Sequence, residues 1–239
     1  MSGHSKWSTI KREKGAKDAK RGAVFTQIGN QIAIAARSGV DPTMNSALAM
    51  AIEKAKQANM SAANIQRAID RVADKNAATL EEATYEAMGP GGIGIIIETA
   101  TDNKNRTFPD VRNALTKNGG RIADAGSVTF QFTRKGVINV AAAGEDALLT
   151  VLDAGAEDAI EEEGEMIVYT ELKDLAKVRT AIIEAGLTVT SAELQYVPNN
   201  MIEISETEQA EKVLKVLDAL EDLDDVTGVH TNADITAEI

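Results

Sequence analysis

Between residues 137 and 195 the sequence patterns of strands and helices alternate in an order that occurs in few folds. Short apolar runs bounded by turn residues predict strands, and apolar residues spaced three and four apart predict helices. The predicted elements are a strand at 137–141, a helix at 146–154, strands at 156–161 and 166–170, a helix at 172–185 and a strand at 187–195. This β-α-β-β-α-β order is that of a ferredoxin-like unit. We therefore predict an inserted α+β domain over residues 135–204.

The segments on either side carry an incomplete version of the same order. Residues 81–134 predict β-β-α-β, and residues 205–239 predict a helix at about 206–220 followed by a strand at 226–231. Neither segment closes a sheet alone, so we predict that together they form one discontinuous α+β domain. The last strand of residues 81–134 is placed at 127–133, before a break at Lys135-Gly136. The inward residues we expect are Val128, Phe130 and Phe132 on that strand, and Phe108, Val111 and Leu115 on the preceding helix.

Residues 1–80 predict a helical domain with a basic N-terminal arm. Three helices are expected, starting near Ala16, at Asp41-Pro42 and at Ser61, with the last two starts marked by capping residues. Their apolar faces carry Phe25, Ile28 and Ile32, then Met44, Leu48 and Ile52, then Ile65, Ile69 and Val72. The predicted fold class is thus α+β, with a three-helix domain followed by two ferredoxin-like domains, one inserted into the other.

Charge is strongly segregated along the chain. Residues 1–75 hold 13 Lys and Arg against 6 Asp and Glu, a net charge of +7, whereas residues 76–239 hold 12 against 31, a net charge of −19. The densest basic stretch is 6–21, which has a net charge of +5. The residues we expect to contact nucleic acid there are Lys6, Trp7, Lys11, Arg12, Lys14, Lys17, Lys20 and Arg21. A basic arm with one aromatic ring suits a phosphate backbone, although a solvated helix face is the alternative.

Several functional classes find no support in the sequence. The chain has no cysteine, which excludes disulfides and thiolate chemistry and fits a cytoplasmic location. No apolar run approaches the roughly 20 residues of a membrane span. The only two histidines, His4 and His230, form no metal-binding spacing, and the serines lack a nucleophile motif. We therefore predict a protein that is not an enzyme and that has no catalytic residue, metal or cofactor.

The loop at 102–107 is the most polar one and has two interpretations. Asn103, Lys104, Asn105 and Arg106 offer amide and cationic groups that suit contact with a phosphate or a protein. The alternative is a structural one, in which Asn105 or Thr107 caps the helix that follows. Two other polar segments, the acidic run 161–165 and the cluster 221–225, are interpreted as solvated turns, and 89–92 as a tight turn.

Several unusual segments occur in a familiar order along nearly the whole chain. They are Gly3-His4-Ser5-Lys6-Trp7, Asp18-Ala19-Lys20-Arg21-Gly22, Ala55–Met60, Gly89–Gly92, Asn103 with Asn105-Arg106-Thr107, Asn118-Gly119-Gly120 and Gly126-Ser127-Val128. In these the sequence resembles the YebC/PmpR family, which includes the mitochondrial translational activator of cytochrome oxidase. The resemblance implies three domains, the third inserted into the second, and no enzymatic activity. It also implies a regulator that binds DNA or acts on translating ribosomes.

The sequence departs from that family's usual pattern in the helical domain. Where basic residues are frequent, this chain has Ala47 and Ala49, and it has Ala87-Met88 where Gly-Tyr is common. The second helix is therefore less cationic than usual, which places more of any phosphate contact on the arm.

Three functional hypotheses follow. The first is a DNA-binding transcriptional regulator, and the second is a ribosome-associated translation factor whose arm binds ribosomal RNA. In both, the acidic α+β domains face a possible protein partner and no membrane is involved. The third is a protein-interaction module in which the arm of one copy docks on the acidic domains of another.

Overall fold

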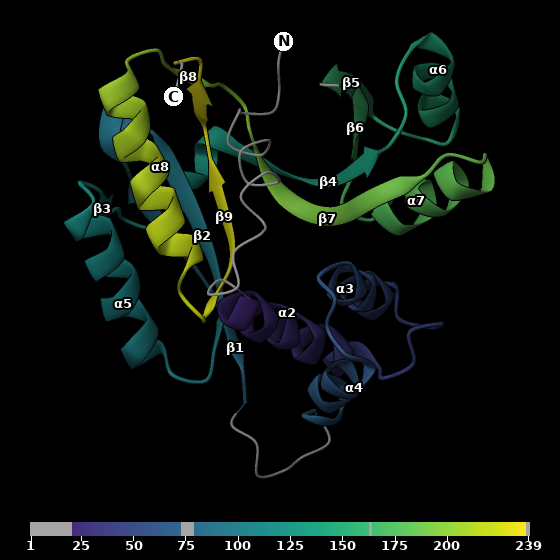
Figure 1. The fold of residues 1–239 in the computed structure, drawn as a ribbon, viewed down its shortest axis with the longest axis horizontal. Helices are drawn as coiled ribbons and strands as arrows, with labels where there is room; N and C mark the ends of the chain where they lie inside the picture. The colour runs from purple at the N-terminus through teal and green to yellow at the C-terminus, as the bar shows by residue number, and fades with distance from the viewer. Residues whose placement is uncertain (1–20, 73–78, 163, 238–239) are drawn as a thin grey trace. The chain divides into compact units, whose positions relative to one another are not determined.

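The computed structural model describes residues 21–72, 79–162 and 164–237 (Figure 1). These residues form two compact units, one of residues 132–197 and the other of residues 21–131 together with 198–237. Both units contain antiparallel strand pairs, and helices accompany the sheets in each, so the predicted α+β class is confirmed. The division into three domains, with boundaries at residues 80, 134 and 204, stays a prediction.

The unit of residues 132–197 has the ferredoxin-like strand order that the sequence predicts. Its four-stranded sheet has the order β5-β6-β4-β7, in which the first and last strands of the unit are neighbours. Helices α6 and α7 pack on this sheet and bury Val151, Val178 and Ile182. The elements are β4 Phe132–Val140, α6 Glu145–Asp153, β5 Asp158–Glu162, β6 Glu165–Thr170, α7 Leu175–Glu184 and β7 Val189–Pro198.

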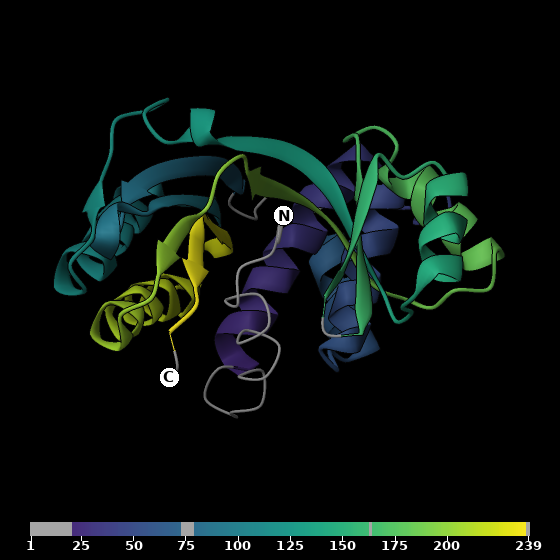
Figure 2. The ribbon, with the colours of Figure 1, turned by 90° about the horizontal axis from the view of Figure 1, so that it is seen from above.

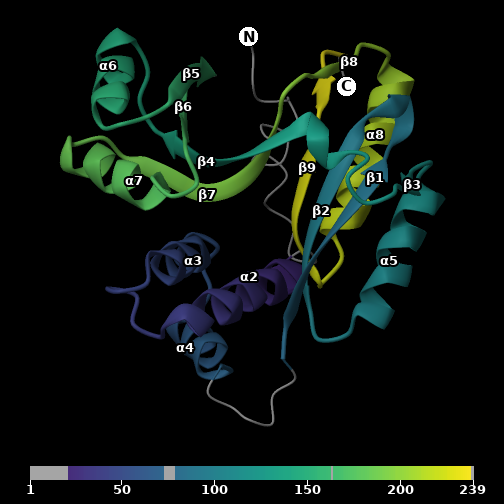
Figure 3. The ribbon, with the colours of Figure 1, turned by 180° about the vertical axis from the view of Figure 1, so that it is seen from behind.

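The other unit contains a second four-stranded sheet, with the order β3-β1-β2-β9. Helices α5 and α8 lie side by side on one face of it (Figures 2 and 3). Ile93, Ile95 and Ile97 are fully buried against these helices because alternate residues of a strand point to the same face. The elements are β1 Glu81–Met88, β2 Gly94–Thr101, α5 Lys104–Lys117, β3 Arg121–Ile122, α8 Thr207–Glu221 and β9 Val226–Thr231, with the short parallel pair β8 Ile202–Ile204 and β10 Ala233–Ile235.

Three helices precede this sheet in the same unit: α2 Arg21–Ala35, α3 Ser46–Gln57 and α4 Ala62–Asp70. Their shared core contains Ile28, Ile32, Leu48, Ile65 and Ile69, as the apolar spacing predicts. Val72, also predicted on this face, lies after the end of α4 and is 39% exposed, so its predicted place is wrong. Ser61 caps α4 as predicted, since its hydroxyl accepts a hydrogen bond from the amide of Asn64 at 3.3 Å.

The start of α3 differs from the prediction. Asn45 caps this helix: its side-chain oxygen accepts from the amide of Leu48 at 3.1 Å, and its amide group donates to the carbonyls of Ala35 and Gly39. Asp41 instead closes a separate turn through Thr43. Met44 therefore precedes the helix and is 87% exposed, so its predicted place on the inward face is wrong.

Helix α2 is bound to the end of the sheet by three amide side chains. Gln27 donates to the carbonyls of Glu221 and Leu223 at 2.7 and 3.0 Å, and Gln31 donates to the carbonyl of Thr227 at 2.9 Å. One turn away, the buried Asn30 donates to the carbonyl of Ala100 at 3.2 Å. These bonds satisfy backbone carbonyls where strands and helix end, and so they join the helices to the sheet as one unit.

The predicted strand at 127–133 is wrong. The chain forms a 3-10 turn at Thr129–Gln131, and β4 then runs without interruption from Phe132 through the predicted break at Lys135-Gly136. The strand that completes β-β-α-β is β3, at Arg121–Ile122. The alternation of apolar residues predicted that Val128, Phe130 and Phe132 share one buried face. Val128 and Phe132 are buried, but Phe130 between them is exposed. Phe108 is likewise half-exposed and lies against Tyr85, with a ring separation of 5.8 Å.

A buried carboxylate holds this irregular segment in place. Glu86 on β1 is 9% exposed and accepts hydrogen bonds from the backbone amides of Gly126 at 2.6 Å, Val128 at 2.6 Å and Thr129 at 2.8 Å. Burial by itself raises the pKa of Glu86, but these bonds and one from the Thr129 side chain outweigh it, and the pKa lies below its usual 4.5. The ionised form of Glu86 is therefore part of the fold.

We expect Glu86→Gln to lower the free energy of unfolding by about 1.5–3 kcal/mol, because amides lose a charged acceptor. The depressed pKa means that the wild-type advantage is complete above pH 4.5 and declines as the pH falls through the lower folded-state pKa. Urea titrations at pH 7 and in acid measure both effects. Glu82→Gln, at an exposed position on the same strand, is the control, and an equal loss in both variants would contradict this role.

Candidate functional site

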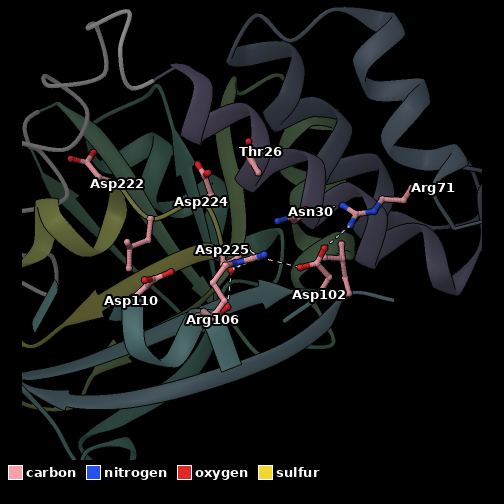
Figure 4. A pocket seen from close by; sticks show the side chains of 12 residues that line it. Thr26, Asn30, Arg71, Asp102, Arg106, Asp110, Asp222, Asp224 and Asp225 are labelled. Atoms are coloured by element: carbon pink, nitrogen blue, oxygen red, sulfur yellow. Dashed lines mark hydrogen bonds and ion pairs between the residues drawn. The ribbon is translucent and has the colours of Figure 1, made fainter. Parts of the chain in front are cut away.

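A pocket of about 570 Å³ lies where helices α2 and α4 meet the end of the sheet (Figure 4). Its walls come from α2, the end of α4, the first two turns of α5 and the turn between α8 and β9. Five aspartates and two arginines line it, namely Asp102, Asp110, Asp222, Asp224, Asp225, Arg71 and Arg106. The pocket contains Arg106 of the predicted contact loop, so its geometry tests what that loop does.

Asp225 is the centre of the hydrogen bonding in this pocket. Its carboxylate accepts from the hydroxyls of Thr107 at 2.7 Å and Thr101 at 3.1 Å, and from the Arg106 guanidinium at 2.9 Å. The hydrogen bond and charge of Asp225, followed by those of Asp102, raise the pKa of Arg106. The interpretation of the cluster 221–225 as solvated is therefore wrong for Asp225, whose side chain is 14% exposed.

The predicted contact loop is largely the first turn of α5. Asn103, and neither Asn105 nor Thr107, caps the helix, because its side-chain oxygen accepts from the amide of Arg106 at 3.2 Å. Lys104 pairs with Glu81 of β1 at 2.6 Å, a contact that raises the pKa of Lys104 and lowers that of Glu81. Asn105 is exposed.

Both arginines of the pocket link separate elements. Arg71, which follows α4, donates to the side-chain oxygen of Asn30 on α2 at 3.2 Å and lies 3.9 Å from Asp102. Arg106 donates to Asp102 at 3.1 Å as well as to Asp225. Each guanidinium therefore already has a carboxylate next to it, and the remaining aspartates make the pocket acidic. An anionic ligand such as a phosphate group would meet this excess of negative charge.

His230 is the one histidine among the described residues. His230 on β9 lies 2.9 Å from Glu98 on β2, as a pair within the sheet. Among the described residues, no three or more His, Cys, Asp or Glu side chains are grouped as a metal ion requires. The search of the same residues for a helix long and apolar enough to cross a membrane found none.

Most of the predicted nucleic-acid contacts lie outside the described residues. These are Lys6, Trp7, Lys11, Arg12, Lys14, Lys17 and Lys20. Arg21 is the first residue of α2. The structure therefore brings Lys104 to β1 and Arg106 to the α8–β9 turn, and Asn103 caps the helix between them. The arm stays a prediction.

Sequence reasoning missed Asn30, Arg71 and Asp225 as members of this pocket. Asp225 lies in an acidic segment whose composition is that of a solvated turn, and Asn30 lies inside an apolar helix. The one local signal was Asn30 itself, since a polar side chain on the buried face of a helix requires a hydrogen-bond partner.

We expect Asp225→Asn to lower the free energy of unfolding by about 2–3 kcal/mol, because three donors lose a charged acceptor. Arg106→Gln should lower it by only about 0.5–1 kcal/mol, because the Arg106 side chain is 51% exposed and solvent screens the pair. Urea unfolding compares the two variants, with Asp224→Asn at the exposed neighbouring position as the control. Equal losses for Asp225 and Arg106 would show that the ion pair, rather than the buried acceptor, dominates.

Comparison with protein families matches both parts of the chain. The model described as the TACO1/YebC protein N-terminal domain matches residues 5–75, and the model described as the TACO1/YebC second and third domain matches residues 80–233. Together they span most of the 239 residues.

Similar proteins match over nearly their whole length. A probable transcriptional regulatory protein of Chlorobaculum tepidum is 47% identical over 100% of this chain and 97% of its own. Another of the same description, from Rubrobacter xylanophilus, is 46% identical over 100% of this chain and 98% of its own. The crystal structure of a conserved hypothetical protein from Aquifex aeolicus superposes with a TM-score of 0.85 at 39% identity, covering 93% of both chains.

Proposed function

Since the chain belongs to the TACO1/YebC family, we propose that it is a non-enzymatic regulator of gene expression that binds nucleic acid through its basic N-terminal arm. The relatives from Chlorobaculum tepidum and Rubrobacter xylanophilus are named probable transcriptional regulatory proteins, which favours DNA as the target. The DNA-binding residues we propose are Lys6, Trp7, Lys11, Arg12, Lys14, Lys17, Lys20 and Arg21.

The separation of charge along the chain carries this proposal. A phosphate backbone attracts the first 75 residues, with a net charge of +7, and repels the remainder, with a net charge of −19. The pocket adds to this argument, because Lys104 and Arg106 are engaged with Glu81, Asp102 and Asp225. The arm then supplies most of the electrostatic attraction, and the acidic remainder, which adds none in net, offers surface to a protein.

The alternative target is ribosomal RNA, as in a translation factor. The same arm would meet the same phosphate chemistry there, and the acidic units would be kept away from surrounding RNA by repulsion. Crosslinking in cells followed by sequencing of the attached nucleic acid separates the two targets. Promoter fragments support the transcriptional role, and ribosomal RNA fragments support the role in translation.

We expect that changing Lys11, Lys14, Lys17 and Lys20 to Gln removes most binding to a DNA duplex. If about five phosphates are neutralised, the logarithm of the affinity should fall with the logarithm of the salt concentration with a slope of roughly −4 to −5 for the wild type. With four of about five phosphate contacts removed, the slope in the variant should shrink to about −1, and fluorescence anisotropy at several salt concentrations measures it.

The matched control changes four lysines of the acidic part to Gln, namely Lys117, Lys173, Lys177 and Lys215, which are all exposed. It alters the net charge by the same amount, so its affinity should remain within about twofold of the wild type if the arm is the contact. Equal losses in the two variants would point to net charge alone, and an unchanged slope in the arm variant would disprove the assignment.

A further inference from the structure

The turn at Thr129–Gln131 presents the ring of Phe130 to solvent. Phe130 is 72% exposed, although Val128 and Phe132 on either side of it are buried. The chain has only eight aromatic residues, and exposure of this ring forgoes the stabilisation that its burial would give. A turn directly before β4 that directs an aromatic ring outward favours a role in binding.

The segment before Phe130 is held by hydrogen bonds to a buried carboxylate. The buried carboxylate of Glu86 accepts from the backbone amides of Gly126, Val128 and Thr129, at 2.6–2.8 Å. The fully buried side chain of Val128 is a second anchor. The segment before Phe130 is therefore held through its backbone amides and through the buried side chain of Val128.

The segment that leaves the ring is fixed as well. The side chain of Asn199 donates to the carbonyl of Phe130 at 3.2 Å, and its backbone amide donates to the carbonyl of Gln131 at 2.8 Å. The Gln131 side chain accepts from the buried Asn232 at 2.9 Å, and Asn232 in turn accepts from the amide of Gly94 at 2.8 Å. A ring held on both sides loses little conformational freedom when a ligand stacks on it.

The polar groups next to the ring are uncharged. Between Gly126 and Phe132 the chain has no charged residue, and Asn199, whose side chain donates to the carbonyl of Phe130, is also uncharged. Glu86 is ionised, but its carboxylate is buried and its oxygens are occupied by backbone amide donors. A single aromatic face with a rim of uncharged hydrogen-bonding groups matches a nucleobase, which offers a flat π-face and an edge of donors and acceptors. A protein hot spot is instead set in a wider apolar contact.

We propose that Phe130 is a stacking platform for an unpaired nucleobase, and that the turn Thr129–Gln131 is a second nucleic-acid contact besides the basic arm. This inference rests on the proposed nucleic-acid binding and extends it to single-stranded segments. The arm binds phosphates of any strand, whereas a stacking ring requires a base that is free of its helix. Stacking depends weakly on the base and the sugar, so single-stranded RNA and single-stranded DNA are both ligands for the ring.

The test measures the affinity of the full chain for fluorescein-labelled 12-nucleotide oligouridine, oligothymidine and a 12-base-pair duplex. Phe130→Ser should weaken binding of the two single strands by about 5- to 100-fold, which is the effect of losing one stacked base, and leave duplex binding unchanged. Phe130→Tyr should bind like the wild type, because it keeps the ring. Phe130→Leu should behave like Phe130→Ser, because it keeps apolar area without the aromatic face.

Leu149→Ser, which removes an exposed apolar side chain from α6, is the control and should leave all three affinities unchanged. The unfolding temperature of Phe130→Ser should equal that of the wild type, because an exposed ring contributes little to stability. A Phe130→Ser protein with wild-type affinity for single strands overturns the platform, whereas loss of binding in the arm variant alone keeps the proposed function. If Phe130→Ser weakens single-strand binding while the arm variant binds like the wild type, the stacking role of Phe130 is supported and the assignment of the arm as a nucleic-acid contact is wrong.

Discussion

One carboxylate, that of Asp225, joins the parts of the larger unit that the chain makes far apart in sequence. It accepts from Thr101 at the end of β2 and from Thr107 and Arg106 on α5, while it belongs to the turn between α8 and β9. These elements bury a continuous apolar core, but apolar contacts are not directional and leave helices free to slide. Hydrogen bonds to a nearly buried anion have defined directions, so they fix where α5 starts relative to the sheet.

Around the same site, the arginine and lysine side chains pair with carboxylates of neighbouring elements. Arg71, Lys104 and Arg106 each lie beside a carboxylate within the larger unit, where they hold helices and strands together. Surface pairs of this kind add little to stability one at a time. Arg71 and Arg106 share Asp102, and Arg106 also binds Asp225, so these four residues form a connected network, whereas Lys104 and Glu81 are a separate pair. Cations used in this way are not available to a phosphate backbone, which explains why a separate basic arm carries that task in the function we propose.

The order of elements was predictable wherever the apolar spacing was regular. The strand β9 occupies the predicted residues 226–231, and α8 differs from its prediction by one residue at each end. The prediction failed where a long-range bond overrides the local pattern. Nothing near Phe130 in the sequence reveals that Glu86, more than forty residues earlier, binds the amides that turn the chain out of a strand.

The pocket was predictable only in its local part. The polar loop before α5 and its capping role follow from residue types, although Asn103 rather than Asn105 or Thr107 is the cap. The place of Asp225 opposite this loop depends on how α8 and β9 return to the sheet, because the partners are more than 115 residues apart. Composition gives no sign of such a contact, since a buried acid and a solvated one look alike in a sequence.

The unit of residues 132–197 interrupts the sequence of the other unit, but the two ends of the interruption lie next to each other. The amide of Asn199 donates to the carbonyl of Gln131, so the two points of departure and return are held together. The inserted unit also closes its own ends, because β4 and β7 are neighbouring strands and Ala141 bonds to Thr188 at their far end. A long unfolded insertion would burden its host with the entropy of loop closure, which grows slowly with length. Once folded, the unit of residues 132–197 connects Gln131 to Asn199 over a short distance, as a hairpin loop does, so its folding lowers the entropic cost of forming the other unit.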